Sequence, residues 1–457
     1  MKKLIWITTI IISFFFIRIE CSAQKLQPNE LKADLDTLVS MIETVHPEPY
    51  HYISKNAFYR KVNKMKEGIN QPMTDYQFYL KVTPLVTSLN DEHTYIGFND
   101  NLSNKNDSCL LFPFTVNIKN ERIFLTKSYC KYKNLEGARL LTINNHPSND
   151  VLKKLRKIVP PGFDKKTKER LIGRLFFRLY PRYFFFPESY NLQVLKNGEK
   201  TEVKINRSDI TENIKLSFYN TENKELKLRF LSEETAKLSA PSFALQRYME
   251  FDSIFAQVKD REIDHLIIDV RGNTGGYKWN VDSLLSYLTT KSYKLYDTAI
   301  EKFSFKSNDY LAKRIDEGKG KKEGQYYIDT SSLVEKTKPT LKKEDKFTGK
   351  IYVLTGTRSF SAAAVFANII QCYSIGKVIG EETGQKTVFY ANGKSVKLPN
   401  TKLSCSISSA KIILPCSKKG HGVIPDYKIQ SDTENIEKNK NKDKILNFTL
   451  ELIEKNK

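Results

Sequence analysis

The chain contains 457 residues, of which 40% are hydrophobic and 28% are charged. This composition is typical of a globular protein of two or three domains and excludes a chain too polar to bury a core. The formal net charge is +22, but the lysines are spread along the chain and no segment interleaves aromatic with basic residues, so the charge does not indicate a nucleic-acid partner.

The first 23 residues predict an export signal. Lys2 and Lys3 precede an almost unbroken apolar run from Leu4 to Ile17, and Cys21-Ser22-Ala23 offers small residues for cleavage. The run is shorter than the roughly 20 apolar residues that a membrane anchor needs. A lipid anchor at Cys21 is disfavoured because Glu20 occupies a position where a small residue is expected. We therefore expect an exported, periplasmic or cell-surface chain with no stable membrane span after cleavage.

Residues 24–98 predict an N-terminal helical bundle. Apolar residues between Leu31 and Val45 recur at helical spacing, and a second run follows a cap at Thr74. His93 lies between this second run and a short strand-like segment. Histidine is the usual general base near neutral pH, although a single histidine in such a loop is more often a loop or capping residue.

Residues 99–215 predict a β-rich module. Short apolar runs are followed by a strand, a polar turn and an amphipathic helix between Gly137 and Ile158. Residues 190–206 alternate as a hairpin around Asn197-Gly198.

Residues 216–435 alternate strand-like and helix-like segments, which predicts an α/β core with crossover connections. A lysine-rich insertion, residues 303–347, separates two core elements, and its basic cluster at 318–324 has a loop-like sequence. Residues 436–457 predict a closing helix. The buried parallel strands are expected at 266–270, 351–354 and 378–379.

The first of these strands runs directly into Arg271–Gly276, a turn with three glycines. Paired glycines allow backbone N–H groups to approach a substrate oxygen. The spacing is not that of a dinucleotide fingerprint, and no P-loop lysine follows, so nucleotide binding is poorly supported. A simple tight turn is an equally good interpretation.

The second strand ends in a short polar turn before a helix of small residues, and Ser361 stands at the start of that helix. The unpaired N–H groups of a helix N-terminus favour developing negative charge. The position therefore suits a nucleophile beside an oxyanion hole, although a serine there is more often an N-cap.

Together these segments resemble the tail-specific or C-terminal processing serine peptidases (family S41), in the branch that includes the tricorn protease core. Gly137 to Pro147 also resembles part of a degenerate PDZ fold. The resemblance implies a crotonase/ClpP-like α/β core, an acyl-serine mechanism on extended or C-terminal peptide segments, and neither cofactor nor metal. Five segments match in family order, namely 89–94, 266–276, 351–367, 379–384 and 422–426.

The resemblance assigns Ser361 as the nucleophile, and the N–H of Ala362 together with that of Gly275 or Gly276 as the oxyanion hole. The general base has two candidates, because the family uses two solutions. Lys386 lies 386 − 361 = 25 residues after the serine, near the place of the family's lysine. His93 fits the place of the histidine used by the other branch, and we favour it because a lysine must be neutralised by burial before it can act.

Position 364 is an alanine where the family often carries a glutamate. The alternative function is therefore a catalytically impaired peptide-binding protein on the same fold. An acyl-CoA hydratase shares the core architecture but is disfavoured by the export signal. Cleavage specificity and oligomeric state are not predicted.

Five cysteines follow the predicted cleavage site, so one thiol must remain unpaired if the others form disulfides within the chain. None has the CxxC spacing of a zinc site. Cys109–Cys130 and Cys405–Cys416 are the pairs that lie near each other in the sequence, but sequence does not establish the connectivity.

Overall fold

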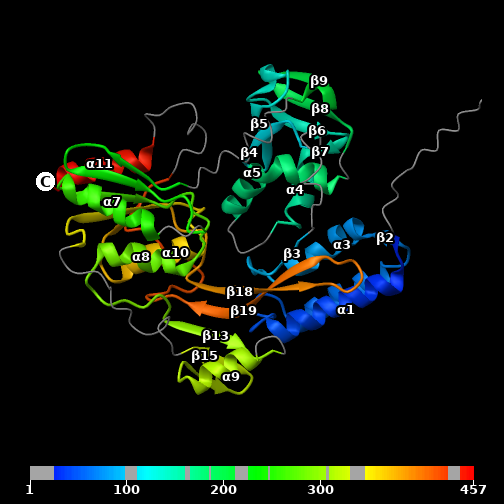
Figure 1. The fold of residues 1–457 in the computed structure, drawn as a ribbon. Helices are drawn as coiled ribbons and strands as arrows, with labels where there is room; N and C mark the ends of the chain where they lie inside the picture. Colours follow the sequence, from blue (N-terminus) through cyan, green and yellow to red (C-terminus); the bar gives the residue numbers. More distant parts are fainter. Residues whose placement is uncertain are drawn as a thin grey trace, which may run out of the picture.

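The computed structural model describes residues 25–97, 111–159, 165–184, 187–210, 225–244, 248–304, 308–329, 345–430 and 443–456. In chain order these form an N-terminal helical part, a β-rich module and an α/β core (Figure 1). Within these ranges, no helix combines the length and the apolar character that crossing a membrane requires. The predicted signal, residues 1–23, lies outside the described residues.

The N-terminal part contains three helices that share one apolar core. The predicted cap at Thr74 is confirmed: its hydroxyl accepts a hydrogen bond from the Gln77 N–H (3.1 Å), and the Gln77 side chain accepts one from the Thr74 N–H (2.9 Å). The elements are α1 (Pro28–Val45), α2 (Lys55–Glu67), α3 (Asp75–Thr87), the paired β1 (Lys25–Leu26) and β2 (Met73–Thr74), and β3 (Tyr95–Gly97).

The β-rich module is an antiparallel sheet of order β4-β5-β6-β8-β9, with β7 on β6 and with helices α4 and α5. The predicted hairpin at Asn197-Gly198 is confirmed, because both residues have positive φ and join directly paired strands. The elements are β4 (Phe114–Lys119), β5 (Arg122–Ser128), β6 (Arg139–Ile143), β7 (His146–Pro147), α4 (Ser148–Leu155), α5 (Lys165–Tyr183), β8 (Ser189–Lys196) and β9 (Glu199–Asn206).

The core is built on a sheet of order β10-β11-β12-β16-β17-β20, in which every pair from β11 to β20 is parallel. The three predicted parallel strands are therefore confirmed. The elements are β10 (Lys227–Phe230), β11 (Thr235–Ser239), α7 (Tyr248–Asp260), β12 (His265–Asp269), α8 (Lys278–Leu288), β16 (Lys350–Thr355), α10 (Ala362–Cys372), β17 (Lys377–Gly380), β20 (Tyr427–Lys428) and α11 (Lys444–Lys455).

The register of this sheet brings two loops together. β12 and β16 are neighbours, with Asp269 opposite Leu354, so both strands end at the same edge. The glycine-rich turn follows β12, and the turn that leads to Ser361 follows β16. The carboxyl ends of parallel strands are where α/β sheets bind their ligands.

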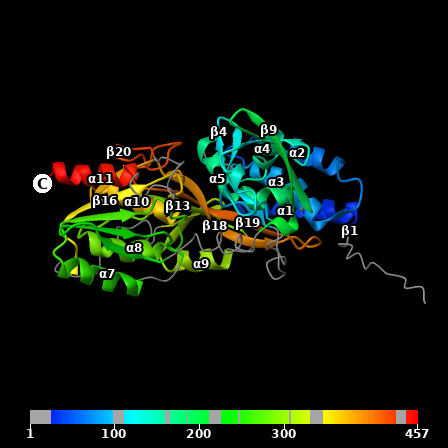
Figure 2. The ribbon, with the colours of Figure 1, turned by 90° about the horizontal axis from the view of Figure 1, so that it is seen from above.

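A second core sheet has the order β14-β15-β13-β19-β18, with β3 also paired to β19. The long β18–β19 hairpin joins the core to the N-terminal helices (Figures 1 and 2). Cys405 and Ile407 of β19 belong to the N-terminal core, whereas Ala410 and Ile412 belong to the α/β core. The strands are β13 (Thr298–Lys302), β14 (Gly320–Glu323), β15 (Tyr326–Asp329), β18 (Val388–Lys397) and β19 (Ser404–Ile413).

The insertion contributes to this sheet. It forms helix α9 (Asn308–Asp316) and the β14–β15 hairpin, and β15 pairs with β13. The loop expected at residues 318–324 is therefore wrong, because lysine stems on an edge strand remain in solvent while the backbone pairs.

The disulfide joins Cys372, at the end of α10, to Cys416 in the segment after β19. Cys130 and Cys405 are unpaired and buried. The pair Cys405–Cys416 suggested by sequence proximity is therefore wrong, because partners are selected by the fold rather than by separation along the chain. Cys109 lies outside the described residues.

Candidate active site

Ser361 occupies a strained position at the start of α10. Its φ of +51° is unusual for a residue with a side chain, and its hydroxyl makes no capping hydrogen bond to the helix. The serine is half-buried. A backbone conformation of this kind typically costs about 1–3 kcal/mol and is often found at functional sites. The interpretation as an ordinary N-cap serine does not fit this geometry.

The turn before Ser361 is held by a buried serine. The Ser359 hydroxyl donates to the Val270 carbonyl (2.8 Å) and accepts from the Gly356 N–H (3.1 Å). The Phe360 N–H donates to the Asn273 carbonyl (3.0 Å). These bonds join the turn after β16 to the turn after β12, so the two predicted catalytic loops lie against each other.

Gly275 and Gly276 have different roles in this contact. A Cβ on Gly275 would lie 2.6 Å from the Ser361 Cβ, so only glycine allows the two loops to approach so closely. The Gly275 N–H, however, donates to the Asn273 side-chain oxygen (2.8 Å). An N–H that is already bonded in this way is not available to a substrate, which argues against Gly275 as a donor of the oxyanion hole.

The Gly276 and Ala362 N–H groups remain as candidate donors. Neither makes a hydrogen bond within the described part of the chain. Gly276 is also exposed, whereas Gly275 is buried. Gly276 is therefore the better of the two glycines predicted for the oxyanion hole.

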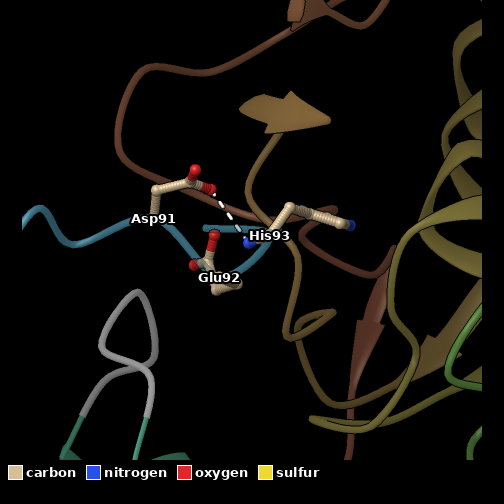
Figure 3. Close-up of side chains that lie close together, drawn as sticks. All are labelled: Asp91, Glu92 and His93. Carbon is tan, nitrogen blue, oxygen red and sulfur yellow. Dashed lines mark hydrogen bonds between the residues drawn. The ribbon is translucent and has the colours of Figure 1, made fainter. Parts of the chain in front are cut away.

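His93 lies in a tight turn that Asp91 stabilises (Figure 3). One carboxylate oxygen of Asp91 accepts from the His93 backbone N–H (3.0 Å), and the other accepts from the Ser408 hydroxyl (2.6 Å) and lies 3.3 Å from His46 Nε2. Burial alone would raise the pKa of Asp91, but the bonds from His46 and Ser408 outweigh it and lower that pKa. Asp91 therefore remains an anion inside the protein and fixes the position of His93.

The imidazole of His93 reaches the nucleophile turn. It stacks on Phe360, the residue before Ser361, with ring centroids 5.7 Å apart. Burial lowers the pKa of His93, against the Asp91 carboxylate and the Tyr390 backbone, which raise it. The neutral imidazole is consequently the stable form near pH 7, as a general base requires.

Lys386 lies in a segment that also contacts the nucleophile turn. The Gly384 N–H donates to the Ser359 carbonyl (3.1 Å), two residues before Lys386. The Lys386 ammonium lies 4.9 Å from the ring centroid of Tyr52. His93 thus contacts the residue before Ser361, whereas Lys386 belongs to a segment whose backbone is bonded to the same turn.

Sequence reasoning missed Glu92, which precedes His93 and interacts with the charge of Lys386. Burial raises its pKa to about 8, and Asp91 adds to this effect, while Lys386 and Gln385 lower the pKa. Gln385 is fully buried. No local pattern marks either residue, because their contact joins segments almost three hundred positions apart.

Asp91, Glu92 and His93 also bring three potential metal-donor atoms within 4.8 Å of one another. Asp91 already uses both carboxylate oxygens in bonds to the protein, and the His93 ring points away from the two carboxylates (Figure 3). The close approach of these three residues is therefore explained by the hydrogen bonds of a rigid turn and does not require a metal ion.

The β-rich module contacts both catalytic segments through one arginine. Arg170 of α5 binds the Glu381 carboxylate through two nitrogens (3.0 Å each) and donates to the Thr357 hydroxyl (3.0 Å). Thr357 precedes Ser361, and Glu381 begins the segment that contains Lys386. This side chain connects the module to the site.

A comparison with protein families matches residues 234–429 to peptidase family S41. The matched segment contains the glycine-rich turn, Ser361 and Lys386. Residues 234–429 form a serine-type peptidase domain of family S41. The predicted family is thereby confirmed, whereas His93 lies outside the matched segment.

Solved structures share the fold of this S41 peptidase. Mature CPAF superimposes with a TM-score of 0.61 at 14% identity, covering 88% of this chain and 92% of that chain. Mature CPAF complexed with lactacystin gives 0.60 at 15% identity, covering 88% and 94%. A putative peptidase from Parabacteroides merdae gives 0.50 at 15% identity, covering 94% and 97%. A sequence comparison with curated proteins found no match. At these identities the likeness concerns the α/β fold alone.

Proposed function

We propose that the chain hydrolyses peptide bonds through an acyl-enzyme on Ser361. The observation that carries this proposal is the contact of the two loops: Ser361 is strained, uncapped and half-buried, and it faces a turn with an exposed, unbonded Gly276 N–H. A nucleophile beside two preorganised donors is the arrangement that acyl transfer needs.

In the proposed reaction, Ser361 Oγ attacks the carbonyl carbon while its proton passes to the general base. The oxyanion accepts hydrogen bonds from the Gly276 and Ala362 N–H groups. The intermediate then collapses, and the base returns the proton to the leaving amine. Water repeats the same steps on the ester and frees the serine. We favour His93 as the base because its ring contacts Phe360 and burial keeps it neutral. Lys386 is the alternative.

We further propose that the peptidase is exported and acts as an endopeptidase on extended or C-terminal peptide segments. The export proposal is supported by the apolar leader, residues 1–23, and places the peptidase in the periplasm or at the cell surface. The β-rich module, proposed as PDZ-like, adjoins the site through Arg170 and is suited to present an extended chain.

The alternative is a catalytically impaired peptide-binding protein. It is favoured by Ala364, which is fully buried in α10 and offers no acid where the family often has one. The two functions differ in whether the Ser361 hydroxyl is reactive.

The test is covalent labelling of the chain by a fluorophosphonate probe, followed by peptide mapping. We expect modification at Ser361 and its loss, together with loss of peptide hydrolysis, in Ser361→Ala. Ser374→Ala is a matched control, because Ser374 flanks the other end of the same helix with a φ of +50° and is exposed. A chain that binds peptides but is never labelled would favour the alternative.

A further inference from the structure

Large exposed aromatic side chains gather in the catalytic segments. Tyr95 lies two residues after His93, Tyr52 lies beneath the Lys386 ammonium, and Tyr277 and Trp279 follow Gly276. Exposed aromatic surface beside reactive residues often marks a binding site. In the described part of the chain, the large hydrophobic side chains that are more than a third exposed are Tyr52, Tyr95, Leu231, Tyr277, Trp279 and Tyr310.

Tyr277 and Trp279 form a stacked pair at the first turn of α8. Their ring centroids are 4.3 Å apart, and the rings are nearly parallel, at 11°. Tyr277 is 45% and Trp279 46% exposed. Almost half of each side chain is therefore accessible to a ligand.

The pair stands on a rigid support. The Tyr277 N–H donates to the Phe243 carbonyl (2.7 Å), and the buried Asn280 side chain donates to the same oxygen (2.8 Å). Two aromatic rings fixed in this way lose little conformational entropy when a ligand binds to them.

The distance to the nucleophile is short. A Cβ on Gly275 would lie 2.6 Å from the Ser361 Cβ, and two residues of chain span at most about 7 Å. A substrate residue within a few positions of the scissile bond can therefore reach the Tyr277 side chain.

We propose that the Tyr277–Trp279 pair binds a large apolar or aromatic side chain of the peptide substrate, close to the scissile bond. The inference rests on the proposed function, which supplies the occupant: a peptide whose carbonyl lies at Ser361. The chemistry is the offset stacking and burial of apolar area that aromatic pairs provide. The platform thus determines where along a peptide the enzyme cuts.

The sequence offers a direct probe of binding. The chain has two tryptophans, Trp6 and Trp279. In a full chain carrying Trp6→Phe and Ser361→Ala, tryptophan emission reports on Trp279 alone, and no hydrolysis interferes. The ligands are short alanine–serine peptides in which a single phenylalanine is moved along the chain.

We expect the emission of Trp279 to shift to shorter wavelengths, with affinity about tenfold higher for one phenylalanine position than for the all-alanine peptide. Equal affinity for all peptides, with unchanged emission, would overturn the proposal. A shift that depends on protein concentration without peptide would overturn it too, since a second copy would then cover the pair.

Kinetics on the active chain separate this proposal from the proposed function. In Trp279→Ala, the ratio of kcat/KM between the preferred phenylalanine peptide and the all-alanine peptide should fall about tenfold. Tyr310→Ala, an exposed aromatic on α9, should keep the wild-type ratio. If Ser361 is labelled but Trp279→Ala keeps the ratio, the platform is refuted and the peptidase function stands. If Ser361 is never labelled while Trp279 still reports phenylalanine binding, the function fails and the binding surface stands.

Discussion

Gly276→Ala should break the contact that positions the oxyanion turn. The added Cβ would lie 2.0 Å from the Phe243 carbonyl carbon and 2.2 Å from the Ala244 nitrogen, which are backbone atoms that have little freedom to move. The φ of Gly276 is +141°, a region that side chains avoid. Strain and overpacking each cost about 1–3 kcal/mol, so the free energy of unfolding should fall by about 4 kcal/mol.

Gly275→Ala should act on the nucleophile as well. Its Cβ would approach the Ser361 Cβ to 2.6 Å and the Phe360 carbonyl oxygen to 3.0 Å, at a φ of +103°. The methyl group must push Ser361 away from the turn, so reactivity should be lost even in molecules that remain folded. Gly272→Ala is the matched control, because it lies in the same turn, is exposed, and has no atom within 4 Å of the added Cβ.

Urea unfolding and the labelling rate of Ser361, measured on all three variants, test this reasoning. Gly272→Ala should remain within about 0.5 kcal/mol of the wild type and keep its labelling rate. If Gly276→Ala were as stable as Gly272→Ala, the turn would not pack on the Phe243 backbone. If Gly275→Ala were labelled at the wild-type rate, the two loops would not touch.

Two further predictions concern pH. With His93 as the base, kcat/KM should fall on the acid side with an apparent pKa below the ordinary 6.5, because burial lowers the pKa of this imidazole. The rate of His93→Ala should fall by about 10²–10⁴-fold, whereas the rate of Lys386→Ala should fall only slightly. The reverse pattern in a pH–rate series would identify Lys386 as the base. The pKa of Glu92 is raised to about 8, so its stabilising contribution is present at acid pH and is lost as the pH rises through 8. Glu92→Gln should therefore reduce the loss of unfolding free energy between pH 5 and 9 by about 4 kcal/mol. An unchanged slope relative to the exposed control Glu451→Gln would contradict this prediction.

The parts of the site that could be predicted from the sequence are those formed by a few consecutive residues. A strand of buried residues that ends in glycines, and another that ends in Ser361, are visible as patterns because each concerns a few consecutive residues. Parallel pairing then places both ends at one edge. The choice between Gly275 and Gly276 was not predictable, because it depends on whether the Asn273 side chain folds back onto its own turn.

Contacts between distant segments could not be predicted from the sequence. Glu92 meets Gln385, and Arg170 meets Glu381, only after three parts of the chain have assembled. Cys372 pairs with Cys416 for the same reason. Helix α5 did carry a signal, since Ile172, Phe176 and Tyr180 recur every four residues and are fully buried, but the arginines between them obscured it.

The two candidate bases are linked through Glu92, and this link favours His93. Lys386 lies over the face of Tyr52, where a cation is stabilised as a cation, and any ionised fraction of Glu92 attracts the same charge. A serine's general base must be neutral before it can act. Burial of His93 works in the opposite direction, because it disfavours the imidazolium. One turn, Asp91–His93, thus carries both the base that burial keeps neutral and a carboxyl group that interacts with the charge of Lys386. In Glu92→Gln a serine–histidine enzyme should therefore keep its acid limb, because the burial of His93 and the Asp91 carboxylate that acts on it are unchanged.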